Sequence, residues 1–425
     1  MRRPIVSFPS VDRAARGRVE KGNVARQNSA EFVAIRSSTA YVWDMPDRVD
    51  GLTQGAVRGR GAGLNPGNRF EDVRLHVLGE HLDEIAVDQP RGVQVSTRVF
   101  RDSSKSILNP VDSPDICFNW SINPYRGCEH GCIYCYARPG HEYLGMSSGL
   151  DFETKILAKV DAPELLRAEL SKKSWMGEGI TISGVTDCYQ PVEATLRITR
   201  RILEVCNEFA QPVNLITKNA LVTRDIDLLA ALARHSASSV ALSITTLDNK
   251  LAARMEPRAS APKERLAAVR KLADAGVPVA VMAAPIVPAL NESEIPAILE
   301  AAKDAGAEKA GFVLLRLPYQ IKALFLDWLA REFPERAAHV EAAIRDTRGG
   351  DLYQTEWGVR QKGTGARAEQ IGKVFEVFAR KHGLVGRNGS RHHGRSNDEF
   401  LRRREARLAK GQLDLFGPMR QAKLF

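Results

Sequence analysis

Short apolar segments recur along the middle of the chain at a nearly constant spacing, and this recurrence limits the possible folds more than any other feature. The segments are Ile180–Gly184, Val213–Thr217, Val240–Ile244, Val277–Met282 and Gly311–Leu315, so successive starts lie 33, 27, 37 and 34 residues apart. The sequence between them has the pattern of helices. A strand, a crossover helix and a second, parallel strand need this length of chain. The spacing therefore predicts βαβ units around a parallel sheet.

A sixth strand is expected just before a cysteine-rich segment at residues 128–135, and it completes an open barrel of six strands. Gly276 and Gly306 fall just past two of the helical stretches, where helices commonly end. The open barrel is the leading expectation, and a doubly wound sheet is the alternative. In both α/β folds the chemistry is expected at the carboxyl ends of the strands.

Regions of different character flank this barrel, which is expected over residues 111–345. Residues 1–110 are irregular and are expected to be partly flexible. Their Gly/Arg-rich stretch at 58–63 is interpreted as a linker or as an arm that contacts phosphate. Residues 346–380 are expected to form a post-barrel cap, and residues 381–425 a basic, partly disordered C-terminal extension.

Most of the net charge of +10 lies in this C-terminal extension. Ten basic and three acidic side chains lie between Arg380 and Gly411, which gives +7 within 32 residues. The segment is either a solvated, partly helical tail or a surface that contacts nucleic acid.

Membrane and secreted classes do not fit the sequence. No apolar run approaches the roughly 20 residues of a membrane span, and the longest candidate, residues 277–290, contains three prolines. The first residues are not followed by a secretory apolar core, and six cysteines in 425 residues do not make a disulfide scaffold. We expect a cytoplasmic protein that does not associate with membranes.

Three of the six cysteines lie within eight residues of one another. Cys128, Cys132 and Cys135 have the spacing C-x3-C-x2-C, and Gly127 and Gly131 allow the loop to turn tightly. Three thiols this close can bind one small inorganic centre if the loop wraps around it. A cubane iron–sulfur cluster usually has four thiolate ligands, so three would leave one iron open for a further molecule.

The neighbours of these cysteines offer two interpretations of the centre. Tyr134, just before the last cysteine, is placed to press against a molecule bound at the open iron. The alternative is a zinc site, which needs a fourth ligand from Cys117, His130 or His141.

The segment from Asn123 to Arg138 resembles the signature of the radical S-adenosylmethionine (radical SAM) superfamily. Within it, the segment is similar to the DNA repair photolyase-like (spore photoproduct lyase-related) branch and to an uncharacterised bacterial subgroup, over roughly residues 58–365. The resemblance implies a partial (βα)6 TIM-like barrel with a [4Fe-4S] cluster on the three cysteines. It implies cleavage of S-adenosylmethionine to a 5′-deoxyadenosyl radical, lyase chemistry on DNA, and an electron donor such as flavodoxin or ferredoxin.

Polar residues at the ends of the predicted strands are the candidate ligands of S-adenosylmethionine. Gly184, Thr186 and Asp187 lie where the resemblance implies contacts to the methionine amino group. Lys218 and Ser243 end the next two strands, where the branch contacts the carboxylate or ribose. The remaining candidates, in later loops, are Arg258 and Asn291. For each residue the alternative is a structural role at a strand end or a helix cap.

A cysteine next to these ligands is the candidate catalytic thiol. Spore photoproduct lyases keep a hydrogen-donating cysteine at a position that corresponds here to about Gly184, whereas Cys188 follows Asp187. This departure counts against simple repair of spore photoproduct. The alternative for Cys188 is a packed loop residue.

Past the barrel, aromatic residues and arginines alternate in a glycine-rich segment. Arg348, Tyr353, Trp357 and Arg360 suit stacking on bases and contact with phosphates. The alternative is a cap that packs Trp357 against the barrel.

A short motif near the end of the chain indicates a protein partner. Gln412, Leu413, Leu415 and Phe416 belong to a pentad that resembles the peptide with which bacterial polymerases and repair proteins dock on the β sliding clamp. The alternative is a C-terminal helix that packs on the body. DNA is the expected substrate; the rivals are radical modification of RNA or protein, and a zinc-stabilised nucleic-acid or clamp-binding module without catalysis.

Overall fold

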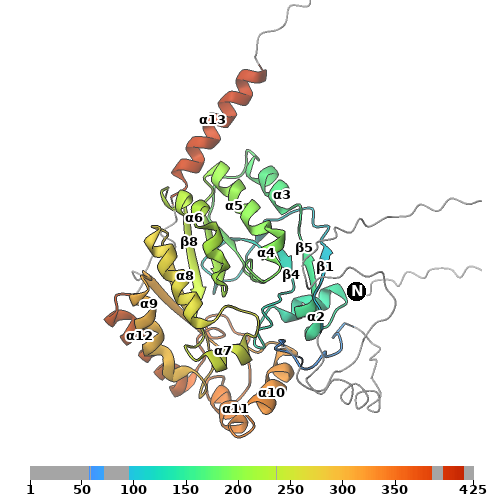
Figure 1. Cartoon of the computed structure of the whole chain (residues 1–425), viewed down its shortest axis with the longest axis vertical. Coiled ribbons are helices and arrows are strands. Elements are labelled where there is room, and N and C mark those ends of the chain that lie inside the picture. Colours follow the sequence, from blue (N-terminus) through green and yellow to red (C-terminus); the bar gives the residue numbers. More distant parts are fainter. Residues whose placement is uncertain (1–56, 58, 71–94, 236, 385–395, 416–425) are drawn as a thin grey trace, which may run out of the picture. The chain divides into compact units, whose positions relative to one another are not determined.

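The computed structural model describes residues 57, 59–70, 95–235, 237–384 and 396–415 (Figure 1). Its core is a sheet with the order β10-β9-β8-β7-β6-β3-β2. The strands are β2 (Asn109–Pro110), β3 (Trp120–Ile122), β6 (Ile180–Ile182), β7 (Val213–Thr217), β8 (Ser238–Ser243), β9 (Val279–Ile286) and β10 (Lys309–Leu314). In this sheet the six strands β3, β6, β7, β8, β9 and β10 pair in parallel, and β2 pairs with β3 in the antiparallel direction. This order confirms the expected partial barrel of six βα units.

The sheet has one face buried more completely than the other. Strand β9 alternates buried and half-buried residues along most of its length, as does β7. Successive side chains of a strand point to opposite faces, so this alternation places one set in the core. Valine, isoleucine and leucine from these strands meet the apolar faces of the crossover helices in a single large core.

Crossover helices connect the parallel strands. They are α3 (Ala162–Leu170), α4 (Glu193–Leu196), α5 (Ile198–Phe209), α6 (Ile226–Ala233), α7 (Asn249–Met255), α8 (Pro262–Asp274) and α9 (Ile295–Asp304), with the 3-10 segments η2 (Ala220–Asp225) and η3 (Glu292–Glu294). Helices α8 and α9 end as expected, just before Gly276 and Gly306. Both glycines have positive φ, 75° and 96°, which a side chain rarely tolerates.

A small second sheet takes one strand from before β2 and two strands from between β3 and β6 in the chain. It has the order β1-β5-β4, from β1 (Arg98–Arg101), β5 (Lys155–Ala158) and β4 (Tyr125–Arg126). The segment that contains the three cysteines leaves β4 and continues into η1 (Arg138–Leu144) and α2 (Leu150–Thr154). This sheet therefore fixes both ends of the cysteine-rich segment.

The region after the barrel is helical. It consists of α10 (Ile321–Glu332), α11 (Ala337–Asp346), α12 (Gly365–Lys381) and α13 (Asp398–Leu415). Helix α12 covers the edge strand, since the rings of Phe312 and Phe375 lie 4.7 Å apart. None of the helices within the described ranges is long and apolar enough to cross a membrane.

The basic C-terminal extension includes a helix that packs on the barrel. Phe400 of α13 is fully buried, and the guanidinium of Arg407 lies 4.1 Å from the ring of Phe209 in α5. Just before α13, Asn397 donates a hydrogen bond to the carbonyl of Met176 at 2.9 Å. Residues near 176 precede β6, so α13 lies at the amino ends of the strands.

Candidate active site

The cysteine-rich segment forms a buried loop at the carboxyl ends of the strands. Cys128 and Cys132 are buried and Cys135 is half-buried. The backbone N–H of Ile133 donates to the carbonyl of Met255, at the end of α7 beyond β8, at 3.1 Å. Burial raises the pKa of each of the three thiols. A bound metal centre offsets this effect because it stabilises the thiolate directly.

The donor set of this loop fits a multi-iron cluster better than a single zinc ion. In the part of the chain that the structure describes, no three His, Cys, Asp or Glu side chains converge on one metal ion. The three thiols are nevertheless close enough to affect the charge of one another. Both histidines proposed as a fourth zinc ligand make other contacts, and Cys117 is exposed.

A buried ion pair holds the loop from behind. Arg138 donates to the carbonyl of Cys132 through Nε at 3.0 Å and Nη2 at 2.8 Å, and Nη2 also lies 2.6 Å from Glu153. Both Arg138 and Glu153 are completely buried. The Glu153 carboxylate accepts two further hydrogen bonds, from the backbone N–H groups of Gly61 at 3.1 Å and Ala62 at 2.9 Å.

The Gly/Arg-rich stretch thus has neither of its expected roles, over the residues that the structure describes. Arg60 is buried and donates to the carbonyls of Glu153 and Val95 at 2.8 and 2.9 Å. A side chain at Gly61 would meet the carbonyl oxygen of Gly131 at 1.9 Å. The expectations of a linker and of a phosphate-contacting arm are both wrong, because Arg60 and Gly61 pack against the cysteine loop and its supporting residues.

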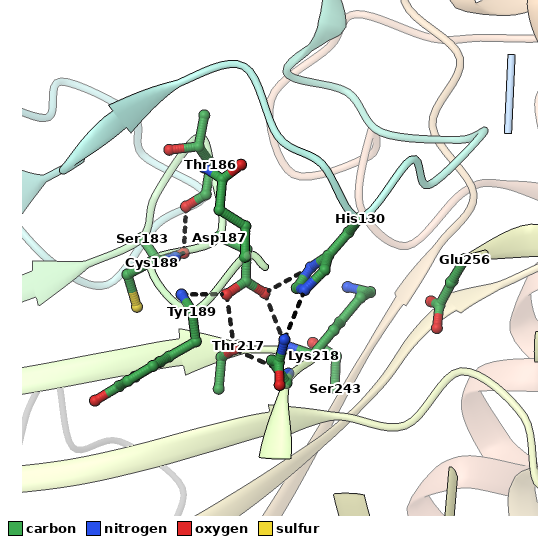
Figure 2. A network of polar contacts seen from close by, with 12 residues as sticks. His130, Ser183, Thr186, Asp187, Cys188, Tyr189, Thr217, Lys218, Ser243 and Glu256 are labelled. Carbon is green, nitrogen blue, oxygen red and sulfur yellow. Dashed lines mark hydrogen bonds and ion pairs between the residues drawn. The ribbon is translucent and has the colours of Figure 1, made fainter. Parts of the chain in front are cut away.

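A second network joins the cysteine loop to the strand ends (Figure 2). Asp187 accepts hydrogen bonds from the N–H of Tyr189 and the hydroxyl of Thr217 on one oxygen, at 2.8 and 2.7 Å. Its other oxygen accepts from the N–H of Lys218 at 2.8 Å and lies 3.3 Å from Nδ1 of His130. Burial would raise the pKa of Asp187, but His130 and these hydrogen bonds lower it to about 2.

The Asp187 carboxylate is therefore occupied by protein donors on both oxygens. Each carboxylate oxygen has about two lone pairs to offer, and here each has two contacts. We infer that Asp187 positions the strand ends and the loop rather than binding the amino group of a cofactor. His130, between two of the cysteines, also lies 3.2 Å from Nδ2 of Asn219.

Asp187→Asn tests this positioning role. The amide of the asparagine would place an N–H group opposite donors, such as the N–H of Lys218, that now donate to the Asp187 carboxylate. At least one of these hydrogen bonds would be lost. We expect the rate of 5′-deoxyadenosine formation to fall about 10–100-fold, the usual cost of losing a partner behind a metal ligand. Asp227→Asn, at an exposed position in α6, is the matched control and should keep the wild-type rate. A variant at Asp187 with an unchanged rate would exclude the positioning role.

A third buried cluster surrounds Tyr134. Its hydroxyl donates to Glu256, which also accepts from Thr245 at 2.5 Å and from Arg265. Arg265 in turn donates to the carbonyl of Ser243 at 2.9 Å. The hydroxyl of Tyr134 is thus engaged, while its ring lies 5.8 Å from Nζ of Lys218.

Lys218 and Ser243 keep polar groups free for a ligand. Among the described residues, Nζ of Lys218 has no ion-pair partner and Oγ of Ser243 has no hydrogen-bond partner. Lys218 follows β7 and Ser243 ends β8, so both lie at the carboxyl ends next to the cysteine loop. Arg258 is half-buried, and its Nη2 lies 3.3 Å from Glu129. These residues stay candidate ligands.

Three other predicted ligands are used within the fold. The side-chain amide of Asn291 accepts from the N–H of Val287 and donates to two carbonyls, and the residue is buried. The hydroxyl of Thr186 donates to the carbonyl of Tyr125 at 2.9 Å. The carbonyl of Gly184 accepts from Tyr136. Thr186 and Asn291 have structural roles because their polar side-chain atoms are engaged.

Cys188, the candidate catalytic thiol, lies inside the fold. It is fully buried in the main apolar core, where burial raises the pKa of its thiol well above the usual value. Its backbone N–H donates to Oγ of Ser183 at 3.2 Å. The turn after β6 thus directs this side chain into the core, and a catalytic role for Cys188 stays a prediction.

The predicted nucleic-acid residues divide into two groups. Arg348 is buried and donates to the carbonyls of Leu314, Leu315, Val359 and Arg360, and burial lowers its pKa to about 10. Its predicted contact with nucleic acid is therefore wrong. Trp357 is exposed, with the guanidinium of Arg360 3.7 Å from its ring centre, and Tyr353 is half-buried. Packing of Trp357 against the barrel is wrong as well.

The clamp-like motif lies at the edge of the described chain. The backbone of Gln412, Leu413 and Leu415 is helical at the end of α13. Phe416 lies outside the described residues, so the motif stays a prediction.

An open barrel of six parallel strands, with a C-x3-C-x2-C loop buried over their carboxyl ends, defines an iron–sulfur barrel enzyme. The chain belongs to the Radical SAM superfamily, whose family model matches residues 122–302. Members of this superfamily use a [4Fe-4S] cluster and S-adenosylmethionine, which are therefore the cofactors of this chain. The residues that would hold the cluster are Cys128, Cys132 and Cys135. The alternative of a zinc site at these cysteines is therefore wrong.

The chain is also similar to uncharacterised proteins and to solved structures. An uncharacterised protein of Mycobacterium tuberculosis (strain ATCC 25618 / H37Rv) is 35% identical over 244 residues, 57% of this chain and 72% of the relative. An uncharacterised protein of Methanocaldococcus jannaschii is 28% identical over 196 residues, 46% and 70% of the two chains. A spore photoproduct lyase complexed with dinucleoside spore photoproduct aligns with a TM-score of 0.49 at 15% identity, over 67% of this chain and 79% of the other. A likeness at this level says nothing about the substrate.

Proposed function

We propose that the protein is a radical SAM enzyme that acts on DNA, as a repair lyase of the photolyase-like kind. The observation that carries the proposal is a set of exposed aromatic side chains, one directly after the last cysteine of the loop and two beyond β10. This aromatic rim consists of Tyr136, Tyr319 and Trp357, which are 48%, 64% and 54% exposed. The guanidinium of Arg360 lies over Trp357, and that of Arg69 lies 4.1 Å from the ring centre of Tyr319.

Alternating rings and guanidinium groups suit single-stranded nucleic acid. Each exposed ring can stack on a base, and arginine contributes charge for the backbone. The likeness of the segment from Asn123 to Arg138 to the DNA repair branch supports DNA over RNA or protein. When bound, the cluster supplies the electron that cleaves S-adenosylmethionine to a 5′-deoxyadenosyl radical.

The residues of this chain would bind and orient the cofactor and the substrate. Lys218 and Ser243 offer free polar groups at the strand ends, while Asp187 and His130 fix the loop that carries the cysteines. A one-electron donor such as flavodoxin or ferredoxin, and docking of the C-terminal motif on a sliding clamp, belong to the proposal as partners.

Substrate class is tested by binding and by turnover. The affinity of the anaerobically reconstituted protein for damaged duplex, intact duplex, single-stranded DNA and tRNA is measured at one fixed salt concentration. Release of 5′-deoxyadenosine is then measured with each polymer. Stimulation by DNA above tRNA is the expected result. Equal or stronger stimulation by tRNA or by a protein would favour the rival substrates.

Trp357→Ala tests the aromatic rim. Stacking of one base on an aromatic side chain contributes about 1–3 kcal/mol, so the affinity for single-stranded DNA should fall about 5–150-fold. Val377→Ala, which removes an exposed side chain from α12, is the control and should leave the affinity unchanged. Undiminished binding by the Trp357 variant would exclude this residue from the substrate surface.

A further inference from the structure

Arg316, two residues beyond β10, has a guanidinium group with no hydrogen-bond or ion-pair partner among the described residues. Its Nε atom is shielded from water, and no described residue accepts a hydrogen bond from it. Nε also lacks a hydrogen bond in Arg69, Arg348 and Arg404, but Nε of Arg69 lies 3.0 Å from Glu142, and Nη2 of both Arg348 and Arg404 donates to backbone carbonyls. No such contact compensates Arg316 among the described residues. A shielded charged donor left unpaired is costly, which indicates a missing acceptor.

The position of Arg316 places this donor at the mouth of the barrel. Its Cζ lies 5.2 Å from the ring centre of Tyr136, the residue that follows Cys135. The hydroxyl of Tyr136 donates to the carbonyl of Gly184, just beyond β6. Tyr136 therefore spans from the β6 end to the β10 end of the open barrel, and Arg316 lies beside the cysteine loop.

The charges around Arg316 leave it uncompensated. The nearby carboxylate is Asp115, which accepts from Nε of Arg360 at 2.5 Å and from the N–H of Gly358 at 2.6 Å. Burial raises the pKa of Asp115, but these hydrogen bonds and the charges of Arg360 and Arg316 lower it overall. The guanidinium groups of Arg360 and Arg316 both lie near this carboxylate, and Arg360 is the one that donates a hydrogen bond to it.

We propose that Arg316 binds one phosphodiester oxyanion of the substrate strand, with the exposed ring of Tyr136 beside the adjoining base. The proposal rests on the proposed function and names the contact that holds the strand next to the cluster loop. A guanidinium fork matches the oxygens of a phosphate in a bidentate arrangement. The carboxylate of S-adenosylmethionine is the other oxyanion available at this mouth, and the experiment distinguishes the two.

The experiment compares Arg316→Gln with the wild-type holoenzyme. Binding of a fluorescent ten-nucleotide oligothymidylate is measured at several salt concentrations, and binding of S-adenosylmethionine is measured separately. We expect the oligonucleotide affinity to fall about 10–150-fold, as for loss of a hydrogen-bonded charge. The slope of log affinity against log salt should decrease in magnitude by about 0.7. The affinity for S-adenosylmethionine should not change. Arg380→Gln, at an exposed site in α12, is the control.

Each other outcome has a defined meaning. Weaker binding of S-adenosylmethionine with unchanged oligonucleotide binding would assign Arg316 to the cofactor carboxylate and overturn the proposal. Unchanged binding of both would also overturn it. If the wild-type protein itself does not bind the oligonucleotide, the proposed function fails instead. Arg316→Lys keeps the charge without the fork, and should lose affinity while keeping the salt slope. This variant gives the decisive result if Arg316→Gln does not fold.

Discussion

Cys132→Ala should reduce the iron content of the purified protein to background and abolish the formation of 5′-deoxyadenosine. The loop has three thiols, and the described residues offer no separate group of three His, Cys, Asp or Glu side chains that could hold a metal ion. Removing one thiol leaves two ligands, too few to hold the cluster. Iron content, absorbance near 400 nm and product formation measure the effect after anaerobic reconstitution.

Two other cysteines provide matched controls for this result. Cys117 is exposed and Cys188 is buried in the core, and neither belongs to the loop. Cys117→Ala and Cys188→Ala should both retain the wild-type iron content. If Cys132→Ala kept its full iron content and its product, the assignment of the three cysteines to the cluster would be wrong.

Glu153→Ala should lower the free energy of unfolding by about 3–5 kcal/mol. The substitution leaves the completely buried Arg138 without its carboxylate, and losing one partner of a buried pair has this cost. It also removes the acceptor for the N–H groups of Gly61 and Ala62. Denaturant-induced unfolding of the variant and the wild-type protein, under the same anaerobic conditions, measures the difference.

Glu300→Ala is the control for this second prediction. Glu300 is exposed in the middle of α9, and its removal should change the free energy of unfolding by less than about 0.5 kcal/mol. If Glu153→Ala were equally mild, the ion pair behind the cysteine loop would not stabilise the fold.

The barrel was predictable because its pattern is local. Each strand is a short apolar run, each crossover has the length of a helix, and the glycines after α8 and α9 mark their ends. The cysteine spacing likewise stands in one short segment. Lys218 and Ser243 could be placed at strand ends because the carboxyl end of a strand can be located from its sequence.

The support around the site could not be predicted in the same way. Glu153 meets Gly61 and Ala62 across about 90 residues, and nothing in either segment indicates the other. Gln190 binds the N–H of Glu129 and the carbonyl of Gly127, again between distant segments. A side chain's orientation is equally hidden, so the sequence could not show that Cys188, predicted at the active site, and Arg348, predicted at a nucleic-acid surface, are both buried.

The basic helix and the aromatic rim lie at opposite ends of the barrel. Helix α13 contacts residues just before β6, since Arg404 donates to the carbonyl of Lys173, whereas Tyr136 contacts Gly184 just after β6. The arginines of α13 therefore do not line the mouth where the cysteines lie.

The segment from Arg60 to Ala62 limits how far the protein can be truncated from its N-terminal side. A fragment cut to the family match at residues 122–302 would carry every cysteine of the loop. It would lack Gly61, whose N–H donates to Glu153 behind those cysteines. Such a truncated protein would expose the rear of an air-sensitive centre to dioxygen. Shortened versions should therefore begin upstream of Val57.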